Sequence, residues 1–396
     1  MSVTSIMGLP QPDPALAFAQ KLLSLLETGS FTTSYKYALL LAILDETLEQ
    51  TGVRGEVPAS LQGRRLGRRV LELYWPQARP YAELEPGADP APEDRRSLRQ
   101  ASVKGDIVSE IGQMHEELEV KPRERLEAVR RRAPGAIGRL EHRVIWRVMR
   151  NPIPRLQVFG GQKAGRLDPF IYEVPWDDSI SLSRANDDSF DDRLRLAPGA
   201  ARHLVTLAGV VRPVVEREWL RYVARRNQLP EAGLEEYLFG SERRALRRLL
   251  PRLRGLQDDR CFYCGDAGTS WEIDHFIPWS RWPDDRLDNL VVAHRSCNNS
   301  KRAAFAATGH LRRWLERFNP GGPQCDELDG IAAELAWPRA AQRTLGTAAL
   351  LYRQQPSGAM LWLRPGEVEP LDPRAVTEVL LSARALAADP PEPYVP

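Results

Sequence analysis

Two pairs of potential metal ligands constrain this 396-residue chain more than any other feature. Cys261 and Cys264 form a Cys-x-x-Cys pair, and His294 and Cys297 form a His-x-x-Cys pair. A Cys-x-x-Cys turn lets two sulfurs face one ion, and tetrahedral Zn²⁺ accepts both thiolates and imidazoles. One such pair can be a coincidence. Two correctly spaced pairs, with 29 residues between them, predict a structural zinc site.

The remaining composition fits a metal-binding chain without a membrane span. Three of the four cysteines lie in the two pairs, and the fourth, Cys325, is expected in a loop. Clustered cysteines with x-x spacing favour metal binding over disulfides. The sequence has no apolar run of 18 residues and no basic region followed by an apolar core at its start. We therefore expect a cytoplasmic protein.

The stretch between the two pairs carries reactive side chains. Residues 271–278 read as a strand ended by a proline, and they include Asp274 and His275. A second strand is expected to begin at Asn289, and a helix opens near Cys297. Aspartate is a hard oxygen ligand suited to Mg²⁺, and histidine can take a proton from water near neutral pH. The pattern predicts a strand, a loop, a strand and a helix around a metal.

These residues, in this order, resemble the HNH endonuclease family, also called ββα-metal nucleases. By position, the resemblance implies that His275 is the general base and that Asn289 orients it or its loop. It also implies that Asp274 and Asn298 hold a catalytic Mg²⁺ or Mn²⁺. The family often has histidine at this last position, so Asn298 is a departure, and Asn299 is a rival for the role.

The resemblance covers 41 of the 396 residues, 261–301. It implies a metal-dependent endonuclease that hydrolyses DNA, most simply double-stranded DNA, with a role in restriction or phage defence. A non-catalytic zinc protein that binds DNA is the main alternative, although zinc alone needs neither the Asp274-His275 pair nor Asn298. An RNA nuclease also stays open. The oligomeric state is not predicted.

Four other side chains in this stretch have two interpretations each. Lys301 could contact a phosphate, or it could be a solvated helix lysine. Trp271, Trp279 and Trp282 could stack on nucleic-acid bases, or they could pack in a core, which is favoured for Trp271.

Net charge is distributed unevenly along the chain. The overall value of +2 hides a segment at 121–155 with eleven basic residues against three acidic ones. A second segment, 241–260, has seven arginines against three acids. Basic segments near a nuclease-like stretch suggest phosphate contacts, whereas solvated helix faces are the ordinary alternative.

Hydrophobic periodicity predicts a mainly α chain with a small α+β module, namely helical N-terminal and middle regions around a zinc-stapled ββα-metal domain. Helices are expected near 13–28, 34–50, 58–73, 98–114, 122–150, 200–226, 241–253, 308–318, 341–353 and 373–387. The N-terminal helices could form a DNA-reading bundle, but a plain bundle is favoured. The expected divisions are a helical N-terminal domain 1–82, a linker 83–97, a mostly helical middle domain 98–240, the HNH domain 241–310 and a helical cap 311–396.

Overall fold

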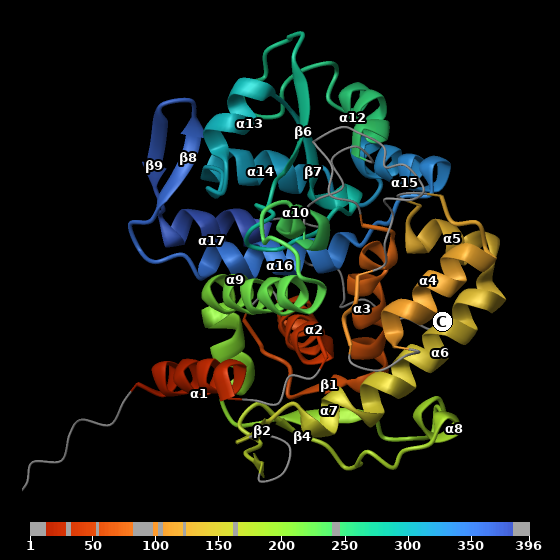
Figure 1. Ribbon diagram of the computed structural model, residues 1–396. Coiled ribbons are helices and arrows are strands. Elements are labelled where there is room, and N and C mark those ends of the chain that lie inside the picture. Colours follow the sequence, from red (N-terminus) through yellow and green to blue (C-terminus); the bar gives the residue numbers. More distant parts are fainter. Residues whose placement is uncertain are drawn as a thin grey trace, which may run out of the picture.

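The computed structural model describes residues 13–28, 33–52, 55–81, 98–101, 106–121, 124–160, 165–239 and 246–382 (Figure 1). Helices account for 57 % of the structure, and the strands form small antiparallel sheets. These features confirm the prediction of a mainly helical chain. The predicted linker, 83–97, lies outside the described residues. Among the described helices, none combines the length and the apolar character that a membrane crossing requires.

Two hydrophobic cores divide the described residues into an N-terminal unit (13–239) and a C-terminal unit (246–382). Figure 1 shows the C-terminal unit, coloured green to blue from α12 onward, above most of the N-terminal unit. The helices of the N-terminal unit are α1 (Pro14–Thr28), α2 (Tyr35–Gln50), α3 (Gly63–Tyr74), the 3₁₀ turn η1 (Pro76–Ala78), α4 (Ile107–Glu117), α5 (Leu126–Arg132), α6 (Pro134–Arg150), α7 (Pro152–Arg155), α8 (Leu182–Ala185), α9 (Ala200–Asn227) and α10 (Leu234–Phe239). Its strands are β1 (Ser60–Gln62), β2 (Val158–Phe159), β3 (Arg166–Leu167), β4 (Tyr172–Glu173) and β5 (Arg193–Leu196).

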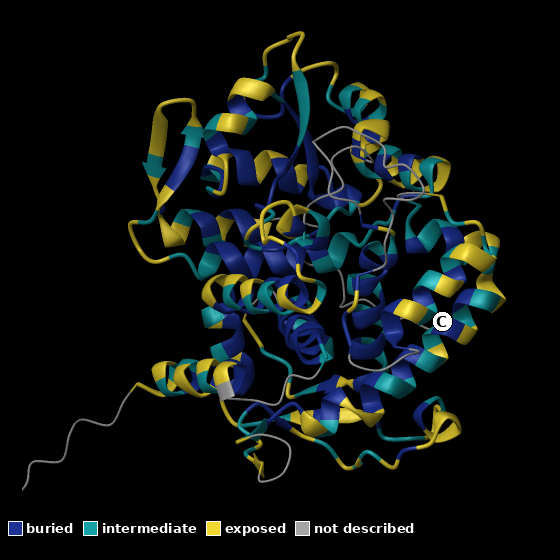
Figure 2. Cartoon of the chain, in the orientation of Figure 1, coloured by how far each residue is buried: buried dark blue, intermediate teal, exposed yellow. Residues whose placement is uncertain are grey.

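Helix α2 lies at the centre of the N-terminal unit. Its residues from Ala38 to Leu44 are all apolar and buried, so the helix has no solvent face along this stretch. Figure 2 shows α2 almost entirely in the colour of buried residues. It packs against α3, α9 and, from the C-terminal unit, α16 (Ala341–Arg353). The prediction of a core helix here is confirmed.

The C-terminal unit surrounds one hairpin with helices. Its helices are the 3₁₀ turn η3 (Arg247–Leu249), α12 (Leu250–Leu256), the 3₁₀ turn η4 (Leu287–Asn289), α13 (Arg295–Lys301), α14 (Thr308–Glu316), α15 (Pro323–Leu335), α16 and α17 (Pro373–Ser382). Its strands are β6 (Trp271–His275), β7 (Leu290–His294), β8 (Met360–Arg364) and β9 (Glu367–Pro370), paired as β6–β7 and β8–β9. Leu350 of α16 belongs to the core of the N-terminal unit, so this helix joins the two units.

Several predicted helix bounds were wrong for local reasons. The helix expected from residue 58 begins at Gly63, because Ser60–Gln62 pairs with β5. The helix expected at 122–150 is broken before Pro134, which has no N–H to donate and starts α6 instead.

Two further predictions from the sequence need correction. The helix expected from residue 98 begins at Ile107, because the Asp106 side chain caps it by accepting a hydrogen bond from the backbone N–H of Ser109 at 2.7 Å. Cys325, expected in a loop, lies in the first turn of α15.

Candidate functional site

The frame of the candidate site is the β6–β7 hairpin followed at once by α13. Asp274 pairs with Val291 and His275 with Leu290 in the antiparallel register. Residues 290–293 are fully buried, which fixes β7 in the core of the C-terminal unit. Asp274 and His275 therefore stand at the end of β6, and their backbone positions are set by a buried partner strand.

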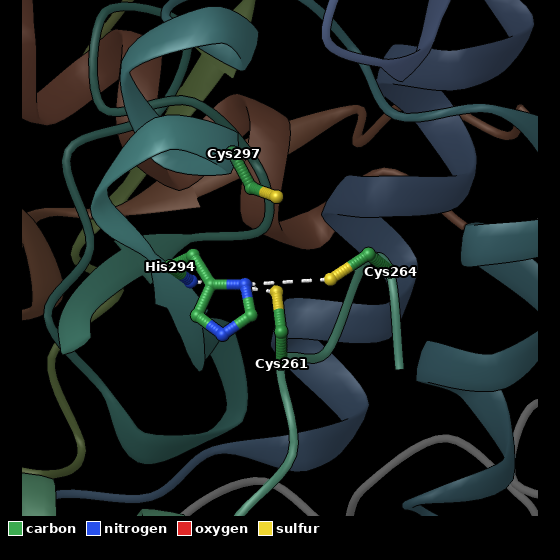
Figure 3. A group of neighbouring side chains, drawn as sticks. All are labelled: Cys261, Cys264, His294 and Cys297. Atoms are coloured by element: carbon green, nitrogen blue, oxygen red, sulfur yellow. Dashed lines mark hydrogen bonds between the residues drawn. The ribbon is translucent and has the colours of Figure 1, made fainter. Parts of the chain in front are cut away.

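The four predicted zinc ligands come together in space (Figure 3). The ligand atoms of Cys261, Cys264, His294 and Cys297 all lie within 4.8 Å of one another. The Nδ1 atom of His294 is 3.4 Å from the Cys264 sulfur, and the His294 backbone N–H donates to the Cys261 sulfur at 3.4 Å. Three sulfurs and an imidazole nitrogen are the donors that Zn²⁺ prefers, so the cluster could hold a zinc ion.

The surroundings of this cluster also suit a cation. Burial and the neighbouring thiols of Cys261 and Cys264 raise the pKa of Cys297 to about 12, and burial raises the pKa of Cys264. Sulfurs held this close become thiolates readily only when a positive charge lies between them.

Trp271 and Gly268 both lie against the His294 ring. The ring stacks on Trp271, with centroids 4.8 Å apart. A Cβ on Gly268 would lie 2.2 Å from His294 Nε2, so a larger residue there would displace the His294 ring or the backbone at residue 268. Sequence reasoning overlooked Gly268.

Asp274 is buried and shares one oxygen with two donors. Its Oδ2 accepts from the Tyr263 hydroxyl at 2.5 Å and pairs with the Lys301 ammonium at 2.9 Å. Lys301 is 1 % exposed and also donates to the backbone carbonyl of His275 at 2.9 Å. It is therefore neither a surface phosphate contact nor a solvated lysine, and both interpretations from the sequence were wrong.

His275 is 9 % exposed, and its Nε2 lies 2.7 Å from Oδ1 of Asp285. Asp285 follows in the loop between β6 and β7, residues 276–289, which we call the β6–β7 loop. The Trp279 ring lies 5.1 Å from the His275 ring, centroid to centroid. Asp285 was overlooked in the sequence because an aspartate in a polar loop carries no distinguishing pattern.

Asn289 holds the two ends of the β6–β7 loop together. Its side chain is fully buried, and its Oδ1 accepts from the backbone N–H of Ile277 at 2.8 Å. Its Nδ2 donates to the backbone carbonyls of Ile277 and Asp284, both at 3.1 Å. This bridge keeps the loop directly beside His275.

Asn298 lies on α13, one helical turn before Lys301. Its Nδ2 donates to Glu272 Oε2 at 2.8 Å, and Arg295 pairs with the other oxygen of Glu272 at 2.8 Å. Glu272 stands two residues before Asp274 on β6, so both point to the same face of the strand. This alternation was available in the sequence, but Glu272 was overlooked. Asn299 is exposed on the helix.

The three tryptophans of this segment differ in how far they are buried. Trp282 is 1 % exposed, so it packs in the core and cannot stack on a base. Trp271 is partly buried and stacks on His294 of the predicted zinc cluster. Trp279 remains partly accessible, and its Nε1 donates to the carbonyl of Phe239 at 3.1 Å.

Ion pairs within the protein balance much of the basic charge counted in the sequence. Within 121–155, the pairs are Arg130–Glu141, Arg132–Glu124, Arg143–Glu110, Arg147–Glu110, Arg155–Asp178 and Arg125–Asp285. Within 241–260, Arg252 pairs with Glu327 and Glu334, and Arg254 pairs with Asp259. A charge run in the sequence therefore overstates the number of arginines that remain for phosphates.

Comparison with known proteins bears on residues 261–307, which match the family model described as HNH endonuclease. Comparisons with curated proteins and with solved structures found no match. The matched segment contains both metal-ligand pairs, the β6–β7 hairpin and α13. Residues 261–307 of this chain thus match the HNH endonuclease family, as the resemblance of the sequence predicted.

Proposed function

We propose that this chain is a cytoplasmic, metal-dependent endonuclease that hydrolyses phosphodiester bonds of double-stranded DNA. One observation carries the proposal. Asp274 and His275 end β6 against α13, the helix of Asn298, inside the segment that matches the HNH endonuclease family. We further propose that β6, β7 and α13 form the ββα-metal arrangement of that family.

The cysteine–histidine cluster would hold a structural zinc ion in this proposal. Its ligands come from the turn before β6, the end of β7 and the start of α13. One ion would therefore connect the start of β6, the end of β7 and α13. The reactive side chains of Asp274 and His275 lie at the opposite end of the hairpin, beside the β6–β7 loop.

The donor set beside His275 fits a hard divalent cation. The two contacts of Asp274 fall on Oδ2, and the hydrogen bond of Asn298 to Glu272 uses its Nδ2. Asp274 Oδ1 and Asn298 Oδ1 are therefore the oxygens to hold Mg²⁺ or Mn²⁺, which prefer such ligands. A cation bound there supplies Lewis-acid stabilisation of the phosphate and of the leaving oxygen.

His275 would take the proton from the attacking water. Asn289, at one end of the β6–β7 loop, would keep the loop against His275 through its hydrogen bonds to Ile277 and Asp284. Lys301 would hold the Asp274 carboxylate and the His275 backbone carbonyl in fixed positions through its ion pair and its hydrogen bond. Each of these side chains is buried and hydrogen-bonded, which limits its movement during the reaction.

DNA would bind through phosphate contacts of exposed arginines. Arg131 and Arg139 of the basic segment 121–155 are exposed and take no part in the ion pairs described above. Such contacts give affinity without sequence choice and weaken with salt. We propose that regions 1–82 and 98–240 supply recognition or regulation, that 241–310 is the HNH domain, and that 311–396 caps it.

The decisive experiment is a cleavage assay with the purified full chain. Plasmid is incubated with Mg²⁺ or Mn²⁺, with His275→Ala as the test variant and His142→Ala, an exposed histidine of α6, as its matched control. We expect cleavage by the wild type and by His142→Ala, and none by His275→Ala. Equal inertness of the wild type and His275→Ala across metals would favour a non-catalytic zinc protein that binds DNA.

Two additional substrates extend the same assay. Preferential cleavage of RNA over DNA would replace the proposed substrate by RNA. Discrimination between modified and unmodified phage DNA is the result expected for a role in restriction or phage defence.

A further inference from the structure

We propose that Asp285 is a positioning residue for His275 and that the N-terminal unit holds Asp285 in place through Arg125. This inference rests on the proposed nuclease function, because it concerns the histidine that would act as the base. Asp285 lies inside the matched segment 261–307, whereas the regulatory element that the proposal adds, Arg125 of the N-terminal unit, lies outside it.

The contact between His275 and Asp285 determines which imidazole nitrogen is left to react. Asp285 Oδ1 lies 2.7 Å from His275 Nε2, and both side chains are largely buried, at 14 % and 11 % exposure. A carboxylate only accepts hydrogen bonds, so it places the hydrogen of a neutral imidazole on Nε2. The lone pair then lies on Nδ1, which becomes the base. A carboxylate orients catalytic and metal-bound histidines in the same way.

The other atoms of Asp285 are held by two residues from distant segments. Its Oδ2 pairs with the Arg125 guanidinium at 3.3 Å, and its backbone carbonyl accepts from Trp337 Nε1 at 2.7 Å. The Arg125 guanidinium also lies 3.7 Å from the centre of the Trp337 ring. Arg125 precedes α5 in the N-terminal unit, so the carboxylate that orients His275 depends on a different unit of the protein.

Two more contacts from the N-terminal unit reach the same loop. Arg286, the next residue after Asp285, lies 3.6 Å from the carboxylate of Glu49 at the end of α2. Trp279 donates to the Phe239 carbonyl at 3.1 Å, and its ring lies beside His275. The β6–β7 loop is thus fastened to the N-terminal unit at residues 279, 285 and 286.

These contacts give the N-terminal unit direct control over the proposed base. Displacement of this unit would release Arg125 from Asp285 and the loop from Glu49 and Phe239. His275 would then lose the partner that fixes its tautomer and its ring orientation. A nucleic acid that binds the N-terminal unit could therefore change the activity of the site without contacting it.

The test compares Asp285→Asn with Glu316→Gln in the full chain. Glu316 is an exposed acid of α14 and serves as the matched loss of one negative charge. We expect Asp285→Asn to lower kcat by about 100-fold or more with little change in KM, at unchanged zinc content. Glu316→Gln should keep the wild-type kcat. Wild-type kcat in Asp285→Asn would overturn the proposal.

A second pair of variants tests the connection to the N-terminal unit. Arg125→Ala should lower kcat by about 10-fold or more, since Asp285 loses its partner. Arg131→Ala removes a positive charge from the same segment, and it should raise KM and change the salt dependence while leaving kcat alone. An effect of Arg125→Ala on KM only would assign this arginine to DNA binding and would contradict the positioning role.

An NMR measurement without DNA keeps the proposal separate from the nuclease function. The ¹⁵N signals of His275, assigned by their loss in His275→Ala, should show the Nε2–H tautomer in the wild type and a mixture in Asp285→Asn. If the wild type cleaves nothing, the nuclease function fails, yet this tautomer shift still supports the Asp285 contact. Identical His275 signals in both proteins would overturn the contact.

Discussion

Glu49 is the residue through which a single substitution should most weaken the association of the two units. Its side chain is 1 % exposed and lies 2.5 Å from Arg69, 2.8 Å from Arg343 and 3.6 Å from Arg286. Arg69 belongs to α3, whereas Arg286 and Arg343 belong to the C-terminal unit. Glu49→Gln keeps the shape of the side chain and removes the negative charge that these guanidiniums share.

The expected loss in the free energy of unfolding depends on which acidic partners the three arginines keep after the substitution. Removing one member of a buried ion pair costs about 3–5 kcal/mol, because its partner stays charged and buried. Arg69 and Arg286 each keep a second acidic partner, at 3.0 Å and 2.8 Å. Arg343 pairs with Glu49 alone among the described residues. We therefore expect Glu49→Gln to lower the free energy of unfolding by about 3 kcal/mol, the lower end of that range.

Urea unfolding followed by circular dichroism measures this loss. Glu316→Gln, which removes an exposed charge from α14, is the control and should stay within about 0.5 kcal/mol of the wild type. A loss below about 1 kcal/mol in Glu49→Gln would refute the reasoning, because a surface ion pair could account for it.

The stabilisation by Glu49 should also depend on pH. Burial acts to raise the pKa of Glu49, but Arg69, Arg286 and Arg343 outweigh it, so the net shift is downward. A carboxyl whose pKa is lower in the folded state stabilises fully above its unfolded pKa, about 4.3 for Glu, and loses this contribution as the pH falls through the folded pKa. The difference between wild type and Glu49→Gln should be constant from about pH 6 to 8 and shrink below about pH 4. A difference unchanged at about pH 3 would contradict this assignment.

Three further predictions concern the metal cluster and helix packing. Gly268→Ala places a Cβ 2.2 Å from His294 Nε2, so its zinc content by elemental analysis should fall well below that of Gly330→Ala, where nothing lies within 4 Å. Gly67→Ala places a Cβ 2.7 Å from Ile145 Cα, where α3 crosses α6. It should lower the free energy of unfolding by about 1–3 kcal/mol in urea, whereas Gly330→Ala should be neutral or stabilising by up to about 1 kcal/mol. Zinc removal by a chelator should lower the melting temperature, and an unchanged melting temperature would argue against a structural ion.

Spacing in the sequence predicted the parts of the site that depend on local structure. The two x-x pairs meet because antiparallel pairing of β6 and β7 returns the chain to Cys261 after the loop. Residues 271–274 alternate apolar and polar side chains, as expected of a strand, and residues 290–293 are apolar enough to fill a core. The spacing of the ligand pairs and the polarity pattern of each strand involve few residues, so they can be recognised in the sequence without knowledge of the rest of the fold.

Contacts between distant segments could not be predicted in this way. The ion pairs of the segment 121–155 join residues that only the folded chain brings together, so counting charge overstated its basic character. Likewise, the burial of Lys301 follows from the packing of α13 against β6, which its position after Asn298 does not reveal.

The family match and the fold together separate two sources of function in this chain. The proposed metal ligands and the proposed base all lie within 261–307, the segment that matches the HNH endonuclease family. Arg125, Glu49 and Trp337, which hold the β6–β7 loop, lie outside that segment. The proposed chemistry therefore belongs to the matched segment, whereas the loop that carries the partner of His275 is held by residues elsewhere in this chain. An excised segment 261–307 would keep every predicted donor atom and would still lose the contacts that we propose to orient His275.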